Sequence, residues 1–224
     1  MAWRSPGEAA LAIRVGLVDS GVSEMQMHLV MGQKDFVGSG AIIDRLGHGA
    51  AIVERLLSSG TEFELCVARV FADQLLCTVD QCAEAINWLI AQKPIFINLS
   101  FGLRRDSEGL RAACAAAVAS DVGLVAANPA QGDAVYPAAY PGVVRATGDA
   151  RCASTEVAWL GSQQADVAGY VGDPATGHAG ASIGCASVSA RLLRMIENNP
   201  GSEFGGLVRQ LEAEAEYHGA ERKQ

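Results

Sequence analysis

The chain has 224 residues, of which 50% are hydrophobic and 19% are charged, and these values exclude an intrinsically disordered or collagen-like protein. Its 17 Lys and Arg residues stand against 25 Asp and Glu residues, a formal net charge of −8. Because no basic cluster offsets this charge, we expect neither nucleic acid nor an anionic membrane surface as a partner.

Short apolar runs rich in β-branched residues alternate with longer stretches of helical periodicity, which predicts an α/β fold with a mainly parallel sheet flanked by helices. In chain order we expect a strand at 13–18, a helix at 47–57, a strand at 62–70, a helix at 79–92 and a strand at 95–99. A helix from 106 or 107 to about 120 follows, and Gly123 is expected to end it. Strands at 124–127 and 143–147, a helix at 182–196 and a last amphipathic helix from about 202 to 211 complete the prediction.

No linker rich in Pro, Ser or Gly divides the chain, so we expect one domain. We assign residues 1–13 to an N-terminal arm, 14–200 to the main domain, and 201–224 to a C-terminal helix and frayed tail of the same domain. The N-terminus lacks a basic segment followed by an apolar one, and the longest apolar stretch, 112–119, is too short to span a bilayer. Six scattered cysteines without CxxC pairs favour reduced thiols and a cytoplasmic location.

Five polar residues stand where α/β proteins gather their ligands. Asp19, Ser100 and Asn128 each follow an expected strand directly, and ligands of open α/β sheets bind at the carboxyl ends of strands. His48 and Ser182 each begin an expected helix, where backbone N–H groups favour negative charge. Taken singly, each position also fits an ordinary turn or helix cap; the five together indicate a functional site.

The motifs around these positions resemble those of the subtilisin-like serine proteases, over residues 14–193 or so. The segments that carry the resemblance are Val15 to Gly21, Gly47-His48-Gly49, Ile97 to Gly102, Ala126-Ala127-Asn128, Tyr136 to Pro141 and Gly180-Ala181-Ser182. The order Asp19, His48, Ser182 is that of the subtilisin triad. The resemblance implies a three-layer subtilisin-like fold and a serine endopeptidase.

Under this resemblance, Ser182 is the nucleophile, His48 the general base, and Asp19 the residue that orients and stabilises the imidazolium. The side-chain amide of Asn128 and the backbone N–H of Ser182 would hold the oxyanion. The segment Ser100, Phe101 and Gly102 would bind a peptide or protein substrate as an added β-strand, beside Ala127.

Two departures from the family pattern affect these expectations. The residues after Ser182 lack the family's Pro and His, which puts the geometry of that helix in question. Ala127 replaces a glycine, and its methyl group would favour a small side chain before the scissile bond. A catalytically degenerate relative that binds peptides or scaffolds a partner protein is therefore the alternative to an active enzyme.

The spacing between the candidate residues is compact, and no acidic loop of the calcium-binding type is visible, so we expect no metal and no cofactor. His28, His178 and His218 lack partners at metal-ligand spacing. The short loops favour narrow-specificity peptide processing over broad digestion. The chain begins almost at its first strand, so we expect no folding propeptide in the usual position.

Overall fold

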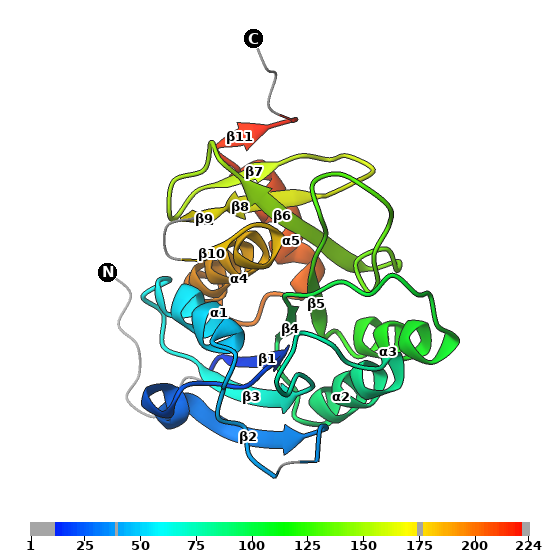
Figure 1. The fold of residues 1–224 in the computed structure, drawn as a ribbon. Coiled ribbons are helices and arrows are strands. Elements are labelled where there is room, and N and C mark those ends of the chain that lie inside the picture. The colour runs from blue at the N-terminus through cyan, green and yellow to red at the C-terminus, as the bar shows by residue number, and fades with distance from the viewer. Residues whose placement is uncertain (1–11, 39, 174–176, 221–224) are drawn as a thin grey trace.

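The computed structural model describes residues 12–38, 40–173 and 177–220, and in it a central sheet lies between two groups of helices (Figure 1). Within these residues the main sheet has nine strands in the order β11-β7-β8-β6-β5-β4-β1-β3-β2. All neighbouring pairs are parallel except β7 with β8. The predicted α/β class with a mainly parallel sheet is confirmed.

The strands of this sheet are β1 (Arg14–Asp19), β2 (Val30–Asp35), β3 (Glu64–Arg69), β4 (Phe96–Leu99), β5 (Gly123–Ala127), β6 (Val143–Asp149), β7 (Val157–Trp159), β8 (Val167–Tyr170) and β11 (Tyr217–His218). Two short strands, β9 (Gly172–Asp173) and β10 (His178–Ala179), form a separate antiparallel pair. The helices are η1 (Glu24–Leu29, a 3₁₀-helix), α1 (His48–Leu57), α2 (Val79–Ala91), α3 (Glu108–Ala119), α4 (Ala181–Asn198) and α5 (Phe204–Ala213).

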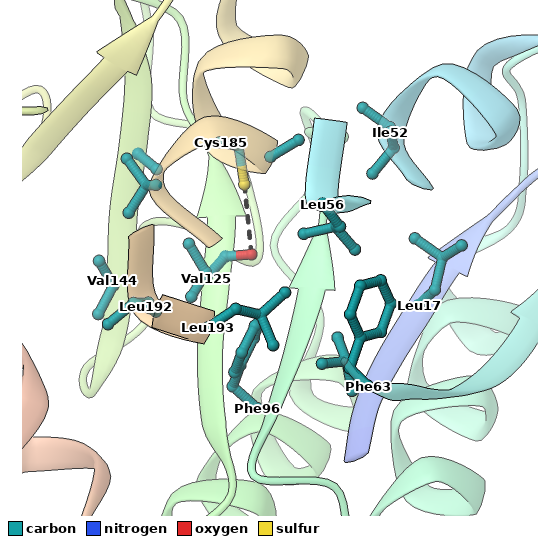
Figure 2. Packing of buried hydrophobic residues seen from close by; sticks show 14 of the residues in the cluster. Leu17, Ile52, Leu56, Phe63, Phe96, Val125, Val144, Cys185, Leu192 and Leu193 are labelled. Atoms are coloured by element: carbon teal, nitrogen blue, oxygen red, sulfur yellow. Dashed lines mark hydrogen bonds between the residues drawn. The ribbon is translucent and has the colours of Figure 1, made fainter. Parts of the chain in front are cut away.

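Side chains on the central strands alternate between two cores, one on each face of the sheet. On β1, Leu17 lies in a cluster with residues of α1, α4 and α5, whereas Val18 lies in a cluster with residues of α2 and α3. Figure 2 shows the first cluster, where Leu193 of α4 lies beside Phe96 of β4 and Leu56 of α1 lies on the side of Phe63. The two buried faces explain why these strands read as continuous apolar runs.

Helix α4 approaches the sheet closely because glycines remove side chains at two contact points. A Cβ on Gly184 would lie 2.2 Å from the carbonyl oxygen of Thr147 in β6, and one on Gly169 of β8 would lie 2.8 Å from the Cβ of Ser187. Ser187, which stands where the family has His, donates its hydroxyl to the carbonyls of Tyr170 and Ile183. The helix therefore runs unbroken from Ala181 to Asn198 despite the altered sequence.

One detail of the sequence prediction is wrong. Gly123 does not end α3, which stops at Ala119; it begins β5, and its partner in the ladder is Phe96. A Cβ at Gly123 would lie 2.3 Å from the ring of Phe204 in α5, so this glycine makes room for a helix far along the chain. The left-handed turn after α3 falls instead on Asp121, whose φ is 55°.

The C-terminal residues join the main structure in two places. Phe204, Leu207 and Leu211 of α5 lie in the first core cluster, and β11 pairs with β7 at the edge of the sheet. Residues 1–11 of the expected N-terminal arm lie outside the described residues, and the proposed domain bounds stay a prediction. No described helix combines the length and apolar character needed to cross a lipid bilayer.

Candidate active site

The start of α1 is held by an aspartate that sequence reasoning missed. One carboxylate oxygen of Asp44 accepts hydrogen bonds from the backbone N–H groups of Leu46 and Gly47, at 2.8 and 3.0 Å, and the other accepts one from Ala50 at 2.8 Å. Gly47 takes the N-cap position with φ 77°, a left-handed conformation that favours glycine. A preceding Asp at a helix start is the sequence signal that would have identified this cap. These bonds fix the backbone that carries His48.

A second set of contacts ties α1 to the end of β1. The Ser20 hydroxyl donates to Asp19 Oδ1 at 3.1 Å and accepts a hydrogen bond from the backbone N–H of Gly49 at 2.9 Å. Gly49 cannot carry a side chain here, because its Cβ would lie 2.2 Å from the carbonyl oxygen of Gly21. The glycines on both sides of His48 thus have separate roles, one in the cap and one in the close approach to β1.

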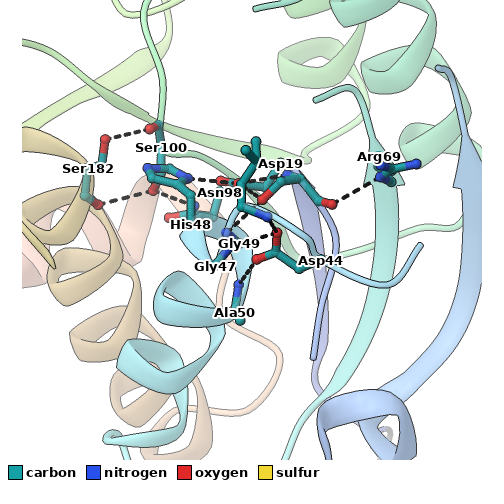
Figure 3. Close-up of polar contacts among 12 residues, drawn as sticks. Asp19, Asp44, Gly47, His48, Gly49, Ala50, Arg69, Asn98, Ser100 and Ser182 are labelled. Carbon is teal, nitrogen blue, oxygen red and sulfur yellow. Dashed lines mark hydrogen bonds and ion pairs between the residues drawn. The ribbon is translucent and has the colours of Figure 1, made fainter. Parts of the chain in front are cut away.

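Asp19 and His48 form a hydrogen-bonded pair (Figure 3). Nδ1 of His48 lies 2.8 Å from Oδ1 of Asp19, whose side chain is fully buried, while the His48 side chain is 18% exposed. Oδ1 also accepts from the backbone N–H of Ser20 at 2.7 Å, and Oδ2 has no hydrogen-bond partner among the described residues. With Nδ1 directed at the carboxylate, a neutral imidazole carries its lone pair on Nε2.

The electrostatic surroundings favour the protonated form of His48. Burial lowers its pKa, but the hydrogen bond and charge of Asp19, with a further contribution from the charge of Asp44, raise it by more. The pKa of His48 therefore lies above its ordinary value of 6.5. A carboxylate that stabilises the imidazolium is what a general base of this kind requires when it accepts a proton.

Ser182 lies at the second position of α4 and is hydrogen-bonded to Ser100 in both directions. Its hydroxyl donates to the carbonyl oxygen of Ser100 at 2.7 Å, and the hydroxyl of Ser100 donates to the carbonyl oxygen of Ser182 at 3.1 Å. Figure 3 shows His48 between Ser182 and Asp19 in this view. Within the described residues no hydrogen bond joins Ser182 to His48, so the structure brings the serine to the site with its hydroxyl turned toward Ser100.

The topology explains why these groups meet. β1 and β4 are neighbours with Leu17 opposite Asn98, so Asp19 and Ser100 leave the sheet at the same edge. Helices α1 and α4, which begin with His48 and with Ala181 before Ser182, pack against each other over this part of the sheet. The predicted strand ends and helix starts thus converge at one place.

Asn98 holds the Ser100 side chain that contacts Ser182, and it was not identified from the sequence. Its amide nitrogen donates to the Ser100 hydroxyl at 2.8 Å, and its carbonyl oxygen accepts from the Ser189 hydroxyl at 2.9 Å. The thiol of Cys185 lies 3.6 Å from the same oxygen. All the side chains in this network are nearly or fully buried, and an Asn inside an otherwise apolar strand was the signal available in the sequence.

Asn128 stands at the carboxyl end of β5, but its amide nitrogen faces other groups. It donates to the carbonyl oxygen of Gln164 at 2.6 Å and of Pro129 at 3.3 Å, and the side chain is 4% exposed. Gln164 is held in place by its own amide, which donates to Pro129 at 3.0 Å. No hydrogen bond among the described residues connects Asn128 with Asp19, His48 or Ser182.

The expected substrate segment follows β4 directly. The ring of Phe101 packs edge-on against Phe71 at 5.5 Å between centroids, and a Cβ on Gly102 would lie 2.6 Å from Val135. The next residue, Leu103, pairs with Tyr136 through two backbone hydrogen bonds of 2.7 and 2.8 Å. Ala127 is 5% exposed and lies in the core cluster under α4.

In the described part of the chain, no group of three or more His, Cys, Asp or Glu side chains is arranged to hold a metal ion.

No known protein-family model matches this sequence, and no curated protein matches it. Solved structures do match the fold of this chain. A cold-adapted subtilisin-like serine proteinase superposes with a TM-score of 0.69 at 20% identity, over 89% of this chain and 81% of the other. A structure described as S41 psychrophilic protease gives 0.67 at 17% identity, over 93% and 86%. The chain therefore has the fold of the subtilisin-like serine proteinases.

Proposed function

We propose that the protein is a serine endopeptidase that cleaves peptide bonds with Ser182 as nucleophile, His48 as general base and Asp19 as its buried partner. The observation that carries the proposal is the 2.8 Å bond between His48 Nδ1 and Asp19 Oδ1 beside a serine at the start of the neighbouring helix. A carboxylate, an imidazole and a hydroxyl in this relation are the groups that acyl transfer requires. The fold of the structural neighbours supports the same reaction class.

The first step requires the Ser182 hydroxyl to turn from the Ser100 carbonyl toward Nε2 of His48. His48 then accepts the proton as the serine oxygen attacks the substrate carbonyl, and the buried Asp19 carboxylate stabilises the resulting imidazolium. The same imidazolium later protonates the leaving amine. Water attacks the acyl-enzyme by the same route, which restores Ser182.

The tetrahedral intermediate carries a negative oxygen that needs fixed donors. We assign these to the backbone N–H of Ser182, at the N-terminus of α4, and to the side-chain amide of Asn128. In this structure Asn128 donates to Gln164 and Pro129. Substrate binding must therefore free one of its N–H bonds, and we expect the 161–165 turn to move when this happens.

The substrate would lie along Ser100, Phe101 and Gly102 as an added strand. Within the described residues, the backbone N–H groups of Phe101 and Gly102 have no backbone partner. These groups suit an extended peptide. Because Val135 closes one side of Gly102 and Ala127 takes the place of a glycine, we propose that a small side chain precedes the scissile bond and that the enzyme processes few substrates.

A degenerate, peptide-binding protein is the second candidate. It is favoured by one observation: both Ser182 Oγ and the Asn128 amide are bonded to backbone carbonyls instead of to a reactive partner. In such a protein the segment 100–102 would bind an extended peptide equally well. A cytoplasmic location is proposed for either protein, because all six cysteines are free thiols.

Cleavage of a peptide library separates the two candidates. An active enzyme cuts peptides after small residues, and Ser182→Ala removes most of that cutting while retaining peptide binding. Ser202→Ala, on the exposed turn before α5, is the matched control and should cut like the wild-type protein. If the wild type, Ser182→Ala and Ser202→Ala bind peptide equally and none cleaves it, the protein is a peptide-binding protein and not an enzyme.

A further inference from the structure

Two cysteines that the proposed reaction does not use lie against each other at the start of α2. Cys77 precedes Thr78, the N-cap of this helix, and Cys82 lies in its first turns. Their sulfur atoms are 3.2 Å apart. The N-cap itself is fixed by a reciprocal pair of bonds between Thr78 and Gln81, so the two thiols are held at this separation by a formed cap.

The two thiols differ in exposure and in acidity. Cys82 is fully buried, whereas Cys77 is half-buried and faces solvent in part. The hydrogen bond from Cys82 lowers the pKa of Cys77 by more than burial and the charge of Asp19 raise it, and the same bond with burial raises the pKa of Cys82. Cys77 is therefore the more nucleophilic and the more accessible of the two thiols. Cys82 stands in the position of a resolving cysteine.

The remaining cysteines lack this arrangement. All four are buried, and burial raises the pKa of Cys114, Cys152 and Cys185 to about 12. Burial likewise raises the pKa of Cys66. Among the described residues only Cys77 and Cys82 have thiols in hydrogen-bonding contact with each other.

We propose that Cys77 and Cys82 are a redox site that closes to a reversible disulfide in the presence of a peroxide. A disulfide needs the sulfur atoms at about 2.05 Å, so they must approach by a little over 1 Å. Closure joins Cys77, which precedes the N-cap of α2, to the first turns of the same helix and so locks the start of α2.

The chemistry balances with hydrogen peroxide as the oxidant. The Cys77 thiolate attacks one peroxide oxygen, the O–O bond breaks, and the other oxygen leaves as water after taking up a proton. The sulfur of Cys82 then attacks the sulfenic acid; the S–S bond forms, the S–O bond breaks, and hydroxide leaves as water with the Cys82 proton. Two thiols lose two electrons, and the peroxide is reduced to two molecules of water.

Peptide mapping of the full chain tests the proposal without any assay of cleavage. The reduced protein is treated with hydrogen peroxide, denatured and alkylated with iodoacetamide. We expect two of the six thiols to escape alkylation, a mass lower by about 2 Da before alkylation, and a disulfide between Cys77 and Cys82 within one tryptic peptide, since no Lys or Arg lies between them. Dithiothreitol should restore both thiols.

Variants make the result specific. Cys77→Ser and Cys82→Ser should each abolish the paired loss, and Cys114→Ser, a buried cysteine in α3, should retain it. If Cys82→Ser does not fold, Cys77→Ser alone tests the proposal, because the partly exposed position 77 tolerates the substitution. Oxidation of Cys77 to a sulfinic acid with Cys82 still alkylatable, or disulfides only between chains, would overturn the proposal.

Discussion

Gly49→Ala should separate His48 from Asp19. The new Cβ would lie 2.2 Å from the carbonyl oxygen of Gly21, and a backbone atom cannot move aside as a flexible side chain can. Real Cβ contacts are essentially never shorter than 3.0 Å, so the first turn of α1 must retreat by about 0.8 Å. Overpacking of this kind costs about 1–3 kcal/mol of stability.

The displacement acts directly on the candidate base. If His48 moves with its helix, its 2.8 Å bond to Asp19 lengthens to about 3.6 Å, beyond the range of a hydrogen bond. The contribution that raises the pKa of His48 is then weakened while the burial that lowers it remains, so the pKa should fall. A misplacement near 1 Å also costs roughly 10²-fold in turnover.

NMR titration of the His48 ring measures this pKa, with the signal assigned from a His48→Gln spectrum. Gly109→Ala is the matched control: Gly109 is the second residue of α3 as Gly49 is of α1, but its Cβ would meet nothing closer than 3.8 Å. The control should leave the His48 pKa and the activity unchanged. An unchanged His48 pKa in a folded Gly49→Ala protein would refute the role assigned to this close approach.

Three further predictions concern pH, the oxyanion and calcium. Because the pKa of His48 is raised, the neutral base is lost as pH falls through a value above 6.5, so peptidase activity should drop with a midpoint above 6.5; a flat profile from pH 5 to 8 would contradict this. Asn128→Ala should lower kcat by about 10²–10³ with little change in KM, and unchanged turnover would remove Asn128 from the oxyanion site. EDTA should leave the melting temperature where it was, whereas a large drop reversed by calcium would reveal a site the sequence did not indicate.

The centre of the fold could be predicted from the sequence and its edges could not. β1, β3, β4 and β5 are buried on both faces, so their apolar residues form runs that stand out. β2 lies at the sheet edge with a polar, half-exposed sequence, and β8 lies in a glycine-rich stretch that suggests turns. Pairing with a neighbouring strand, which the local sequence does not encode, makes these segments strands.

For the candidate site, positions could be predicted but side-chain directions could not. Strand ends and helix starts placed Asp19, His48 and Ser182 because those signals are local. The directions of the Ser182 hydroxyl and the Asn128 amide depend on carbonyls of Ser100 and Gln164, which come from remote segments. Such contacts are set by tertiary packing and leave no mark on the sequence around either residue.

Covalent labelling with a fluorophosphonate tests most directly whether Ser182 is an activated nucleophile. An activated Ser182 should take up one phosphonyl group per chain in the wild-type protein, and labelling should weaken as pH falls and His48 becomes protonated. Ser182→Ala should fold and take up none, and Ser202→Ala should label like the wild type. Wild-type protein that is folded, binds peptide and takes up no label at any pH from 6 to 9 would show that Ser182 is not an activated nucleophile.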